Sequence, residues 1–451
     1  MFIFLLNLLT FVTIALYDGT WAVIFSLFFL YISGIGISFL LQNKKNNDLR
    51  LLLTLFNAAF FIYISFAFIS YLGYLSSGGF YAPDHQLFYD NGDLLSHQNS
   101  LKSIYQLCFV DRIHHENEGA FFLFGTLGYF ANNCFDGNSV LFQTIYVSFF
   151  TLLINLFVFK ILQFYVPKRS AFKYCIYYML FAYVLAGSPW ILRDNHIALF
   201  FSIAIYIVHL SFSLRRFVTL LILQIIVYEF RFEHGIFFIF FPLIYLWVKG
   251  GENKFKHLYY LIVILSAVLV TLQSVSYINS SVNTMVTTAN YYIQLTQTQA
   301  EESGGLGNLL YQLPIGVKQI AILFFSQISP FPPWYSIAKA PNIYFAIHGI
   351  ILGFSSIFWG YVVFTSIKGL KSHFYSFPRL TIWLVVFAII LLLGNTTNIS
   401  VRRIMAVYPV IYILYVVTQT QNTRIQNRRN LIQYSLIYSL LLIAYLLIKL
   451  L

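Results

Sequence analysis

Charged side chains are scarce in this chain of 451 residues, because Asp, Glu, Lys and Arg together make up only 9% of it. A soluble domain usually carries about 25% charged residues, which keep its surface in water. The shortage of charge therefore excludes an ordinary soluble protein. Hydrophobic residues make up 59% of the chain. They form runs of about 20 residues, the length that crosses a bilayer as a helix. The sequence thus predicts an all-α polytopic membrane protein.

Cysteine is also rare, and the three cysteines are Cys108, Cys134 and Cys175. Their spacing matches neither a structural zinc site nor a Cys-x-x-Cys redox motif, so we expect thiols in apolar surroundings. A disulfide between Cys108 and Cys134 is the alternative if that region faces an oxidising compartment. The adjacent His114 and His115 lack the spacing of metal ligands. The chain has no GxxxxGK[ST] phosphate-binding loop, which argues against an ATPase. We predict no metal and no cofactor.

Acidic residues are fewer than basic ones, 15 against 27, which gives a net charge of +12. In a soluble protein this excess would suggest a nucleic-acid partner, but in a membrane chain it is typical of cytoplasmic loops. Only Asp48 and Glu252 of the acids lie among the basic clusters. We therefore predict a lipid bilayer and no nucleic acid as partner. The clusters that we place in the cytoplasm are Lys44, Lys45 and Arg50; Lys168, Arg169 and Lys173; Arg215 and Arg216; Lys249, Lys254 and Lys256; Lys368, Lys371 and Arg379; and Arg424, Arg428 and Arg429.

This placement predicts about 13 transmembrane helices, in a range of about 12 to 14, within one membrane domain over residues 1–451. We expect a retained first helix, because the first run has neither a basic leader nor a small-residue cleavage site. Two long extracytoplasmic segments follow, at 76–138 and 279–338. The second contains 315–333, which we expect to be re-entrant or interfacial, since a crossing there would break the alternation of sides. The predicted spans are 2–17, 20–41, 51–75, 139–164, 174–190, 196–213, 217–230, 235–248, 258–278, 341–366, 380–395, 404–420 and 431–450.

Three segments on the predicted outer face carry arginine at a similar depth. They read "SPWILRDNHIALF", "YEFRFEHG" and "NTTNISVRRIMAVYP", with Arg193, Arg231, and Arg402 and Arg403. One guanidinium group can donate two parallel hydrogen bonds to a phosphate group, and a helix N-terminus adds N–H groups that have no partner within the helix. We predict a diphosphate site, with Asp194 only holding Arg193 or capping the helix. The alternative is that each arginine reaches lipid headgroups or pairs with an acid.

The segment "YEFRFEHG" places ionisable residues between two apolar runs that are barely long enough to cross. Such residues at membrane depth are candidates for function. Glu233 or His234 is a candidate general base, because partial burial moves a carboxylate toward neutral pH and histidine already titrates near it. The alternative is a structural pair between Arg231 and a glutamate that closes a helical hairpin.

The outer segments supply candidate sugar-binding groups. Asp90 and Asp93 suit sugar hydroxyls, and they also fit the divalent-ion acids of lipid-phosphate sugar transferases. His196 is expected to line the cavity, and Trp334 in "SPFPPWYS" is expected near the interface. Glu118 begins an apolar run, so it is the acid of the first segment most expected at membrane depth.

The segments "NEGAFFLFGTLGYF", "SPWILRDNHIALFFSIAIYIVHLSFSLRR" and "YEFRFEHGIFFIFFPLIY" resemble the Wzy-type O-antigen and exopolysaccharide repeat-unit polymerases. "SQISPFPPW" and "SVRRIMAVYP" are similar to later landmarks of that family, so the resemblance covers roughly 116–410. It matches Glu118, Arg193 with Ala198, and His234. The family often continues with Ser-Ala after this histidine, whereas Gly235 follows here.

The resemblance implies a glycosyltransferase of the bacterial inner membrane that acts at the periplasmic face. It would move a glycan from one undecaprenyl diphosphate onto the repeat unit carried by another, with Glu118, Glu233 or His234 as catalytic groups. A chain-length regulator is a further partner that it allows. Two alternatives stay open. One is a GT-C type transferase with catalytic Asp90 or Asp93, and the other is a flippase or transporter, which usually shows paired broken helices.

Overall fold

The computed structural model describes residues 2–42, 48–112, 117–250, 313–314, 316–394 and 401–450, with single positions and short pieces at 257, 259–261, 263–265 and 268. These residues form helices, and no strand occurs among them. The second long outer segment up to residue 312 and most of the span expected at 258–278 lie outside the described residues.

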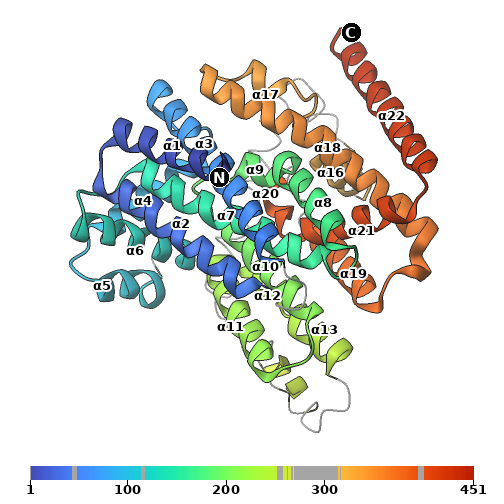
Figure 1. The fold of residues 1–451 in the computed structure, drawn as a ribbon, viewed down its shortest axis with the longest axis horizontal. Coiled ribbons are helices and arrows are strands. Elements are labelled where there is room, and N and C mark those ends of the chain that lie inside the picture. Colours follow the sequence, from blue (N-terminus) through green and yellow to red (C-terminus); the bar gives the residue numbers. More distant parts are fainter. Residues whose placement is uncertain are drawn as a thin grey trace.

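The helices follow one another closely along the chain (Figure 1). In the first half they are α1 (Phe2–Asp18), α2 (Trp21–Leu41), α3 (Leu49–Ser77), α4 (Pro83–Ser96), α5 (Leu101–Tyr105), the π-helix η1 (Gln106–Val110), α6 (Glu118–Cys134), α7 (Val140–Leu162), α8 (Lys168–Phe181), α9 (Tyr183–Gly187) and α10 (Arg193–His209). In the second half they are α11 (Leu214–Phe230), α12 (Phe232–Phe238), α13 (Phe240–Lys249), α16 (Val317–Ser326), α17 (Tyr335–Ala338), α18 (Ile343–His373), η2 (Phe374–Ser376), α19 (Arg379–Gly394), α20 (Val401–Ile404), η3 (Met405–Val407), α21 (Tyr408–Gln421) and α22 (Arg424–Leu450).

Several helices have the length and composition of membrane spans. Among the described residues these are Trp21–Leu41, Leu49–Ser77, Val140–Leu162, Phe232–Lys249, Ile343–Ser376 and Arg424–Leu447. Shorter apolar helices cover Phe2–Asp18, Leu101–Val110 and Arg379–Leu393. The prediction of an all-α membrane protein is thus confirmed, while the count of about 13 spans stays a prediction.

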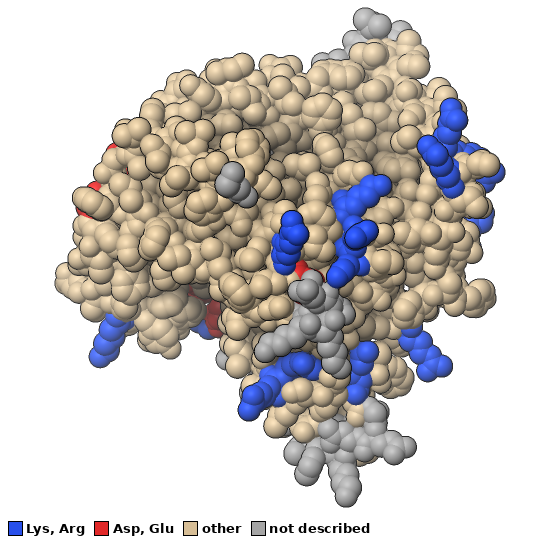
Figure 2. All heavy atoms as spheres, viewed as in Figure 1, with Lys and Arg blue, Asp and Glu red and all other residues tan. Residues whose placement is uncertain are grey.

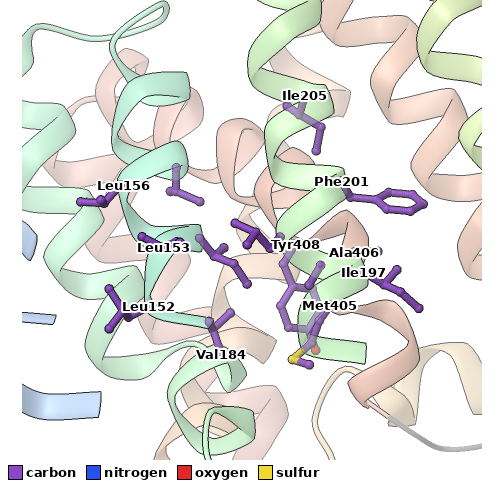
Figure 3. Packing of buried hydrophobic residues seen from close by; sticks show 14 of the residues in the cluster. Leu152, Leu153, Leu156, Val184, Ile197, Phe201, Ile205, Met405, Ala406 and Tyr408 are labelled. Atoms are coloured by element: carbon purple, nitrogen blue, oxygen red, sulfur yellow. The ribbon is translucent and has the colours of Figure 1, made fainter. Parts of the chain in front are cut away.

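Helix α7 is the central element of the fold. Nearly all of its side chains are buried, and it packs against α2, α3, α8 and α10. Figure 3 shows side chains of α7, α9, α10 and residues 405–408 gathered in one apolar cluster. Leu152 of α7, Ile197 of α10 and Met405 of η3 all belong to it. This cluster fixes the start of α10, which carries Arg193, relative to the segment that carries Arg402.

The first long outer segment differs from the expected loop, because it contains α4, α5, η1 and α6. Pro83 lies in the first turn of α4, a position where its fixed φ favours a helix. Helices α4 and α6 then pack closely against each other (Figure 1). A Cβ on Gly92 would lie 2.8 Å from Cβ of Phe124, and one on Gly125 would lie 2.7 Å from Cβ of Leu95. Gly92 and Gly125 thus allow α4 and α6 to approach closely. The segment therefore folds into helices that pack against each other, and it is not an open loop.

The segment at 315–333 contains α16, whose ten residues span about 15 Å, half of a bilayer core. The proline-rich stretch after it lies directly on α18. A Cβ on Gly353 would lie 2.6 Å from the carbonyl oxygen of Pro333, and one on Gly349 would lie 2.9 Å from the carbonyl carbon of Ser336. This geometry is compatible with an interfacial or re-entrant segment, which stays a prediction.

Most of the basic side chains seen in Figure 2 lie over the right and lower parts of this face, and a few lie apart at the lower left. Figure 2 shows Lys and Arg over the ends of α8, α11, α13, α19 and α22, beside a large surface without charge. These are clusters that the sequence places in the cytoplasm. Their common location is what the positive-inside rule requires of residues on one side of a bilayer.

A buried ion pair ties α3 to the end of α7 on this side. The ammonium of Lys160 lies 2.6 Å from a carboxylate oxygen of Asp48, and the two side chains are 5% and 0% exposed. Lys160→Met leaves that buried carboxylate without its ammonium partner, so we expect a loss of about 3–5 kcal/mol in unfolding free energy. Lys160→Met with Asp48→Asn should lose less, because neither charge remains. Thermal unfolding of the purified protein in detergent measures both.

The matched control is Lys173→Met, which removes an exposed lysine from α8 and should leave the melting temperature unchanged. Equal melting temperatures for Lys160→Met and the wild type would contradict the prediction.

Candidate functional site

Arg193 is held at the first residue of α10 by a tight buried turn. The side-chain amide of Asn195 donates hydrogen bonds to the carbonyl oxygens of Gly187 and Trp190, at 2.9 and 3.0 Å. These bonds close the turn between α9 and α10, and α10 begins directly after it. The guanidinium of Arg193 therefore projects from a fixed helix N-terminus, whose first N–H groups have no partner within the helix.

The segment "YEFRFEHG" forms a break between two helices that fold back on each other. Helix α11 ends at Phe230, Arg231 is extended, and α12 begins at Phe232. A Cβ on Gly235 would lie 2.4 Å from Cα of Tyr228. A residue with a side chain cannot fit there without moving the backbone, which explains why glycine follows His234 in this chain.

Arg231 pairs across this break with the start of α10. Its Nη1 lies 2.5 Å from Oδ1 of Asp194, and both side chains are buried, at 7% and 4% exposure. Nη1 of Arg193 also donates to the carbonyl oxygen of Phe230, at 3.2 Å. The expected proximity of Arg193 and Arg231 is therefore present. Asp194 holds Arg231 rather than Arg193, and it replaces the glutamate expected as a structural partner.

Arg402 comes to the same place from α20. Helix α20 packs against α10, and the charges of Arg231, Arg402 and Arg193 all favour the ionised carboxylate of Asp194. Arg402 itself forms an ion pair with Asp84 in the first turn of α4. Arg402 is 23% exposed and Asp84 is 49% exposed, so this pair is open to solvent, unlike the first. The side chain of Arg403 lies outside the described residues.

His85, beside Asp84, is a further member that the sequence did not single out. Its side chain is buried, and its ring centroid lies 5.8 Å from that of Trp190. Burial, followed by the charge of Arg402, lowers the pKa of His85 to about 3, so the imidazole is neutral at pH 7. In the sequence, Pro83 could have indicated the role of both residues. A helix that starts at this proline places Asp84 and His85 together in its first turn.

Glu118 begins α6 against the last turn of α11. A Cβ on the next residue, Gly119, would lie 3.0 Å from the carbonyl oxygen of Glu229. Glu118 is 3% exposed, and its Oε1 has no hydrogen-bond partner among the described residues. Buried carboxylate oxygens normally have partners, so this one is available to a ligand or a water molecule.

The other two candidate bases have different surroundings. Glu233 is exposed on α12, and the positive charges of Arg231 and Arg193 act on its carboxylate. His234 is buried, and its ring centroid lies 6.0 Å from that of Phe201. His234 is 1% exposed and Glu118 is 3% exposed, so Glu233 is the one of these three candidates that lies open at the surface.

The aspartates Asp90 and Asp93 do not join this cluster. Asp90 is exposed, and Oδ1 of Asp93 accepts a hydrogen bond of 2.9 Å from the side chain of Asn138. Asp93 follows Asp84 by nine residues, which is about 13 Å along the helix and about half a turn around it. The end of α4 that carries Asp93 therefore lies beside α6 and Asn138, away from Arg402.

His196 and Trp334 also lie apart from the arginines. His196 is buried among the rings of Phe124, Phe150 and Phe230, at centroid distances of 5.0–5.8 Å. Trp334 is 43% exposed beside α17. His196 thus lies in the interior, and Trp334 lies at the surface, where a tryptophan can act as an anchor. The sugar-binding roles of both residues stay predictions.

The arrangement brings Arg193, Arg231, Arg402 and Glu118 to the junctions of α6, α10, α11 and α20. It offers guanidinium donors and a helix N-terminus to an anion, with a carboxylate nearby. The described residues contain no group of three or more His, Cys, Asp and Glu side chains suited to a metal ion. The three cysteines are not joined in disulfides, and Cys134 is exposed rather than buried as expected.

Gly235→Ala tests the break that supports this arrangement. The added methyl group meets the backbone of Tyr228, so we expect α11 and α12 to separate and the unfolding free energy to fall by about 1–3 kcal/mol. Gly36→Ala in α2 is the control, because a Cβ there meets nothing within 4 Å. Thermal unfolding in detergent compares the two variants, and the prediction is wrong if they melt alike.

Comparison with known proteins adds no relative to this description. No family model matches the chain, no curated protein is similar to it, and no solved structure matches its fold. The functional interpretation therefore rests on the residues and their geometry.

Proposed function

We propose that this protein is a glycosyltransferase that joins oligosaccharide repeat units carried on undecaprenyl diphosphate. The observation that carries the proposal is the meeting of the starts of α6 and α10 with the break between α11 and α12. The start of α6 contacts Glu229, Arg193 donates to the carbonyl of Phe230, and Arg231 pairs with Asp194. The resemblance to repeat-unit polymerases falls on the same segments, at Glu118, Arg193 and His234. Under this proposal the site faces the periplasm, on the inner membrane of a bacterium.

Arg193 and Arg402 are the groups that we assign to the diphosphate. Each guanidinium has five N–H donors, and the Arg402–Asp84 pair leaves several of them for a ligand. Arg231 is already paired with the buried carboxylate of Asp194, so we assign it the task of positioning the start of α10. Two guanidinium groups and the N-terminus of α10 would stabilise the charge that develops on the diphosphate as it leaves.

The transfer itself needs no nucleotide, because the sugar–diphosphate bond supplies the free energy. A hydroxyl oxygen of the acceptor attacks the anomeric carbon of the donor glycan, and the bond from that carbon to the diphosphate oxygen breaks. Undecaprenyl diphosphate leaves with the bonding electron pair. The acceptor proton passes to a carboxylate, and we assign this role to Glu118, whose Oε1 has no hydrogen-bond partner among the described residues. Glu233 and His234 remain the other candidates.

Deletion of the gene tests this function in cells. We expect surface glycans to carry single repeat units in place of the ladder of polymers, because units would be exported but not joined. Gel electrophoresis of the surface glycans measures the pattern, and expression of the wild-type chain should restore the ladder. A full ladder in the deletion strain contradicts the proposal, and loss of every repeat unit from the surface indicates a flippase.

Arg193 and Arg231 can be separated by variants in the same cells. Arg193→Ala should lower polymer formation by about 10²–10³-fold, the usual effect of removing one group that stabilises developing charge. Its melting temperature should fall less than that of Arg231→Met, because Arg193 is half-buried and gives up one hydrogen bond, to the carbonyl oxygen of Phe230. Arg231→Met should lower both polymer formation and the melting temperature, because it leaves Asp194 as an unpaired buried carboxylate.

Three control variants complete the comparison. Arg215→Ala removes an exposed arginine from the predicted cytoplasmic end of α11 and should retain the ladder. Asp90→Asn and Asp93→Asn should also retain it, because neither side chain faces the arginines. Loss of the ladder in either aspartate variant, with Arg193→Ala unaffected, would favour a GT-C type transferase instead.

A further inference from the structure

Two apolar pockets lie along the line where α18 and α19 run beside each other, which we call the α18–α19 seam. The two helices form a hairpin that turns at η2, and both pack on α21 (Figure 1). One pocket, of about 210 Å³, lies beside the turn, where Phe374 and Phe377 line it. The other, of about 180 Å³, lies farther from the turn, where Val363 and Leu392 line it. Each is more than ten times the space that one water molecule needs, about 10–15 Å³.

The walls of both pockets offer no hydrogen bond to an occupant. Their linings include the polar side chains of Gln327, Ser366 and Thr381. Each already has a partner in the protein, because Gln327 accepts from Trp359, Ser366 donates to backbone carbonyl oxygens, and Thr381 bonds to Tyr165. Water does not fill an apolar space of this kind, since its hydrogen bonds would be lost there. A hydrocarbon chain is the occupant that suits these walls.

The seam is open at the surface and has the depth of one leaflet of a bilayer. Ile367 and Ile389 line the pocket farther from the turn and are 50% and 47% exposed. Along α19, the linings extend from Thr381 to Leu392, a rise of about 16 Å. The hydrocarbon core of a bilayer is about 30 Å thick, so this length is about half of it. An acyl chain of the leaflet on the side of the hairpin turn would therefore lie along the whole seam.

Two basic side chains stand at the end of the seam beside the turn. Lys371 lies one helical turn after Ile367 on the same face of α18, and Arg379 lies one turn before Ile382, which lines the first pocket. Both basic side chains are exposed. This is the end that the sequence places in the cytoplasm, where the headgroup of a phospholipid would lie above its acyl chains.

The positive charge at this end has no carboxylate to balance it. Residues 303–451 contain no Asp or Glu. The ion pairs among the described residues involve other side chains than Lys371 and Arg379. Lys368, on the other face of α18, bonds to the neutral side chain of Asn430 at 3.0 Å, and the charge of Arg429 acts against it. An anion would find cations here, whereas the ammonium of a zwitterionic headgroup would find no acidic partner.

We propose that the α18–α19 seam binds an anionic phospholipid of the predicted cytoplasmic leaflet. Its phosphate would lie between Lys371 and Arg379, and one acyl chain would cover both pockets. The site is separate from the arginine site, because Arg402 follows the opposite end of α19. The lipid-linked substrates carry their diphosphate at that opposite end under the proposed function. A phospholipid is therefore the occupant that matches both the charge and the depth of the seam.

Native mass spectrometry of the full-length protein in detergent tests this site. The probes are phosphatidylglycerol and phosphatidylcholine with identical acyl chains, and phosphatidylglycerol should bind at least tenfold more tightly. Lys371→Ala with Arg379→Ala should weaken binding of phosphatidylglycerol roughly thirtyfold, about fivefold for each basic residue that attracts an anionic lipid. Binding of phosphatidylcholine should stay unchanged in this double variant. Ile389→Trp places a ring in the seam and should weaken binding of both lipids.

The matched controls lie elsewhere on the same side of the protein. Lys173→Ala with Arg215→Ala removes two exposed basic residues from α8 and α11, and Ile432→Trp enlarges a residue that is 50% exposed on α22, outside both linings. Both should bind phosphatidylglycerol as the wild type does. Lys371→Ala with Arg379→Ala should also keep the wild-type melting temperature in lipid-free detergent, because both residues are exposed.

Three outcomes would overturn the proposal. One is an affinity of the Lys371 and Arg379 double variant for phosphatidylglycerol within twofold of the wild type. Another is an equal loss in the Lys173 and Arg215 double variant, which would indicate attraction to positive charge in general. The third is tighter binding of undecaprenyl phosphate than of phosphatidylglycerol, abolished by the same Lys371 and Arg379 changes, which would assign the seam to the carrier lipid. The charge variants decide the question even if Ile389→Trp does not fold.

Discussion

The buried pair between Arg231 and Asp194 is the interaction on which the site depends. Both groups are almost completely removed from water, so each would be strongly destabilising without the other. Their short contact can form only if the start of α10 and the break between α11 and α12 keep one relative position. That position also brings Arg193 to the carbonyl of Phe230 and makes a glycine necessary at residue 235. One electrostatic requirement therefore fixes several backbone segments.

The site lies where helices break, and this has a cost in an apolar environment. Backbone groups outside a helix need partners, and non-helical backbone at membrane depth is tolerated where protein or a water-filled cavity supplies them. Here side chains supply them, since Asn195 donates to Gly187 and Trp190, and Arg193 donates to Phe230. The same breaks expose helix N-terminal N–H groups and arginines to a ligand. The residues that complete the hydrogen bonds of the backbone are thus the same ones that offer donors to an anion.

Local signals in the sequence predicted the helices and the arginine segments but not the pairing between them. Apolar runs gave α1, α2, α3 and α7 nearly to the residue, because each is long and bounded by polar turns. Arg231 was predicted to bind diphosphate, with a neighbouring glutamate as its partner in the structural alternative, but it pairs with Asp194, 37 positions away in sequence. Spacing along one chain does not show which distant helix supplies a charge. The helices within 76–138 were missed for a similar reason, since α4 is polar outside and finds its apolar partner only in α6.

The two arginine pairs differ in a way that suits a reaction cycle under the proposed function. Asp194 is 4% exposed, so no ligand can replace it without unfolding the start of α10, and its pair with Arg231 stays a fixed support. Asp84 is 49% exposed, so water already competes with its carboxylate for Arg402. A diphosphate, with more charge and more acceptor oxygens, would compete better. Binding of the donor would then release the first turn of α4 from Arg402. The exposed pair is therefore the contact through which occupation of the anion site would act on α4.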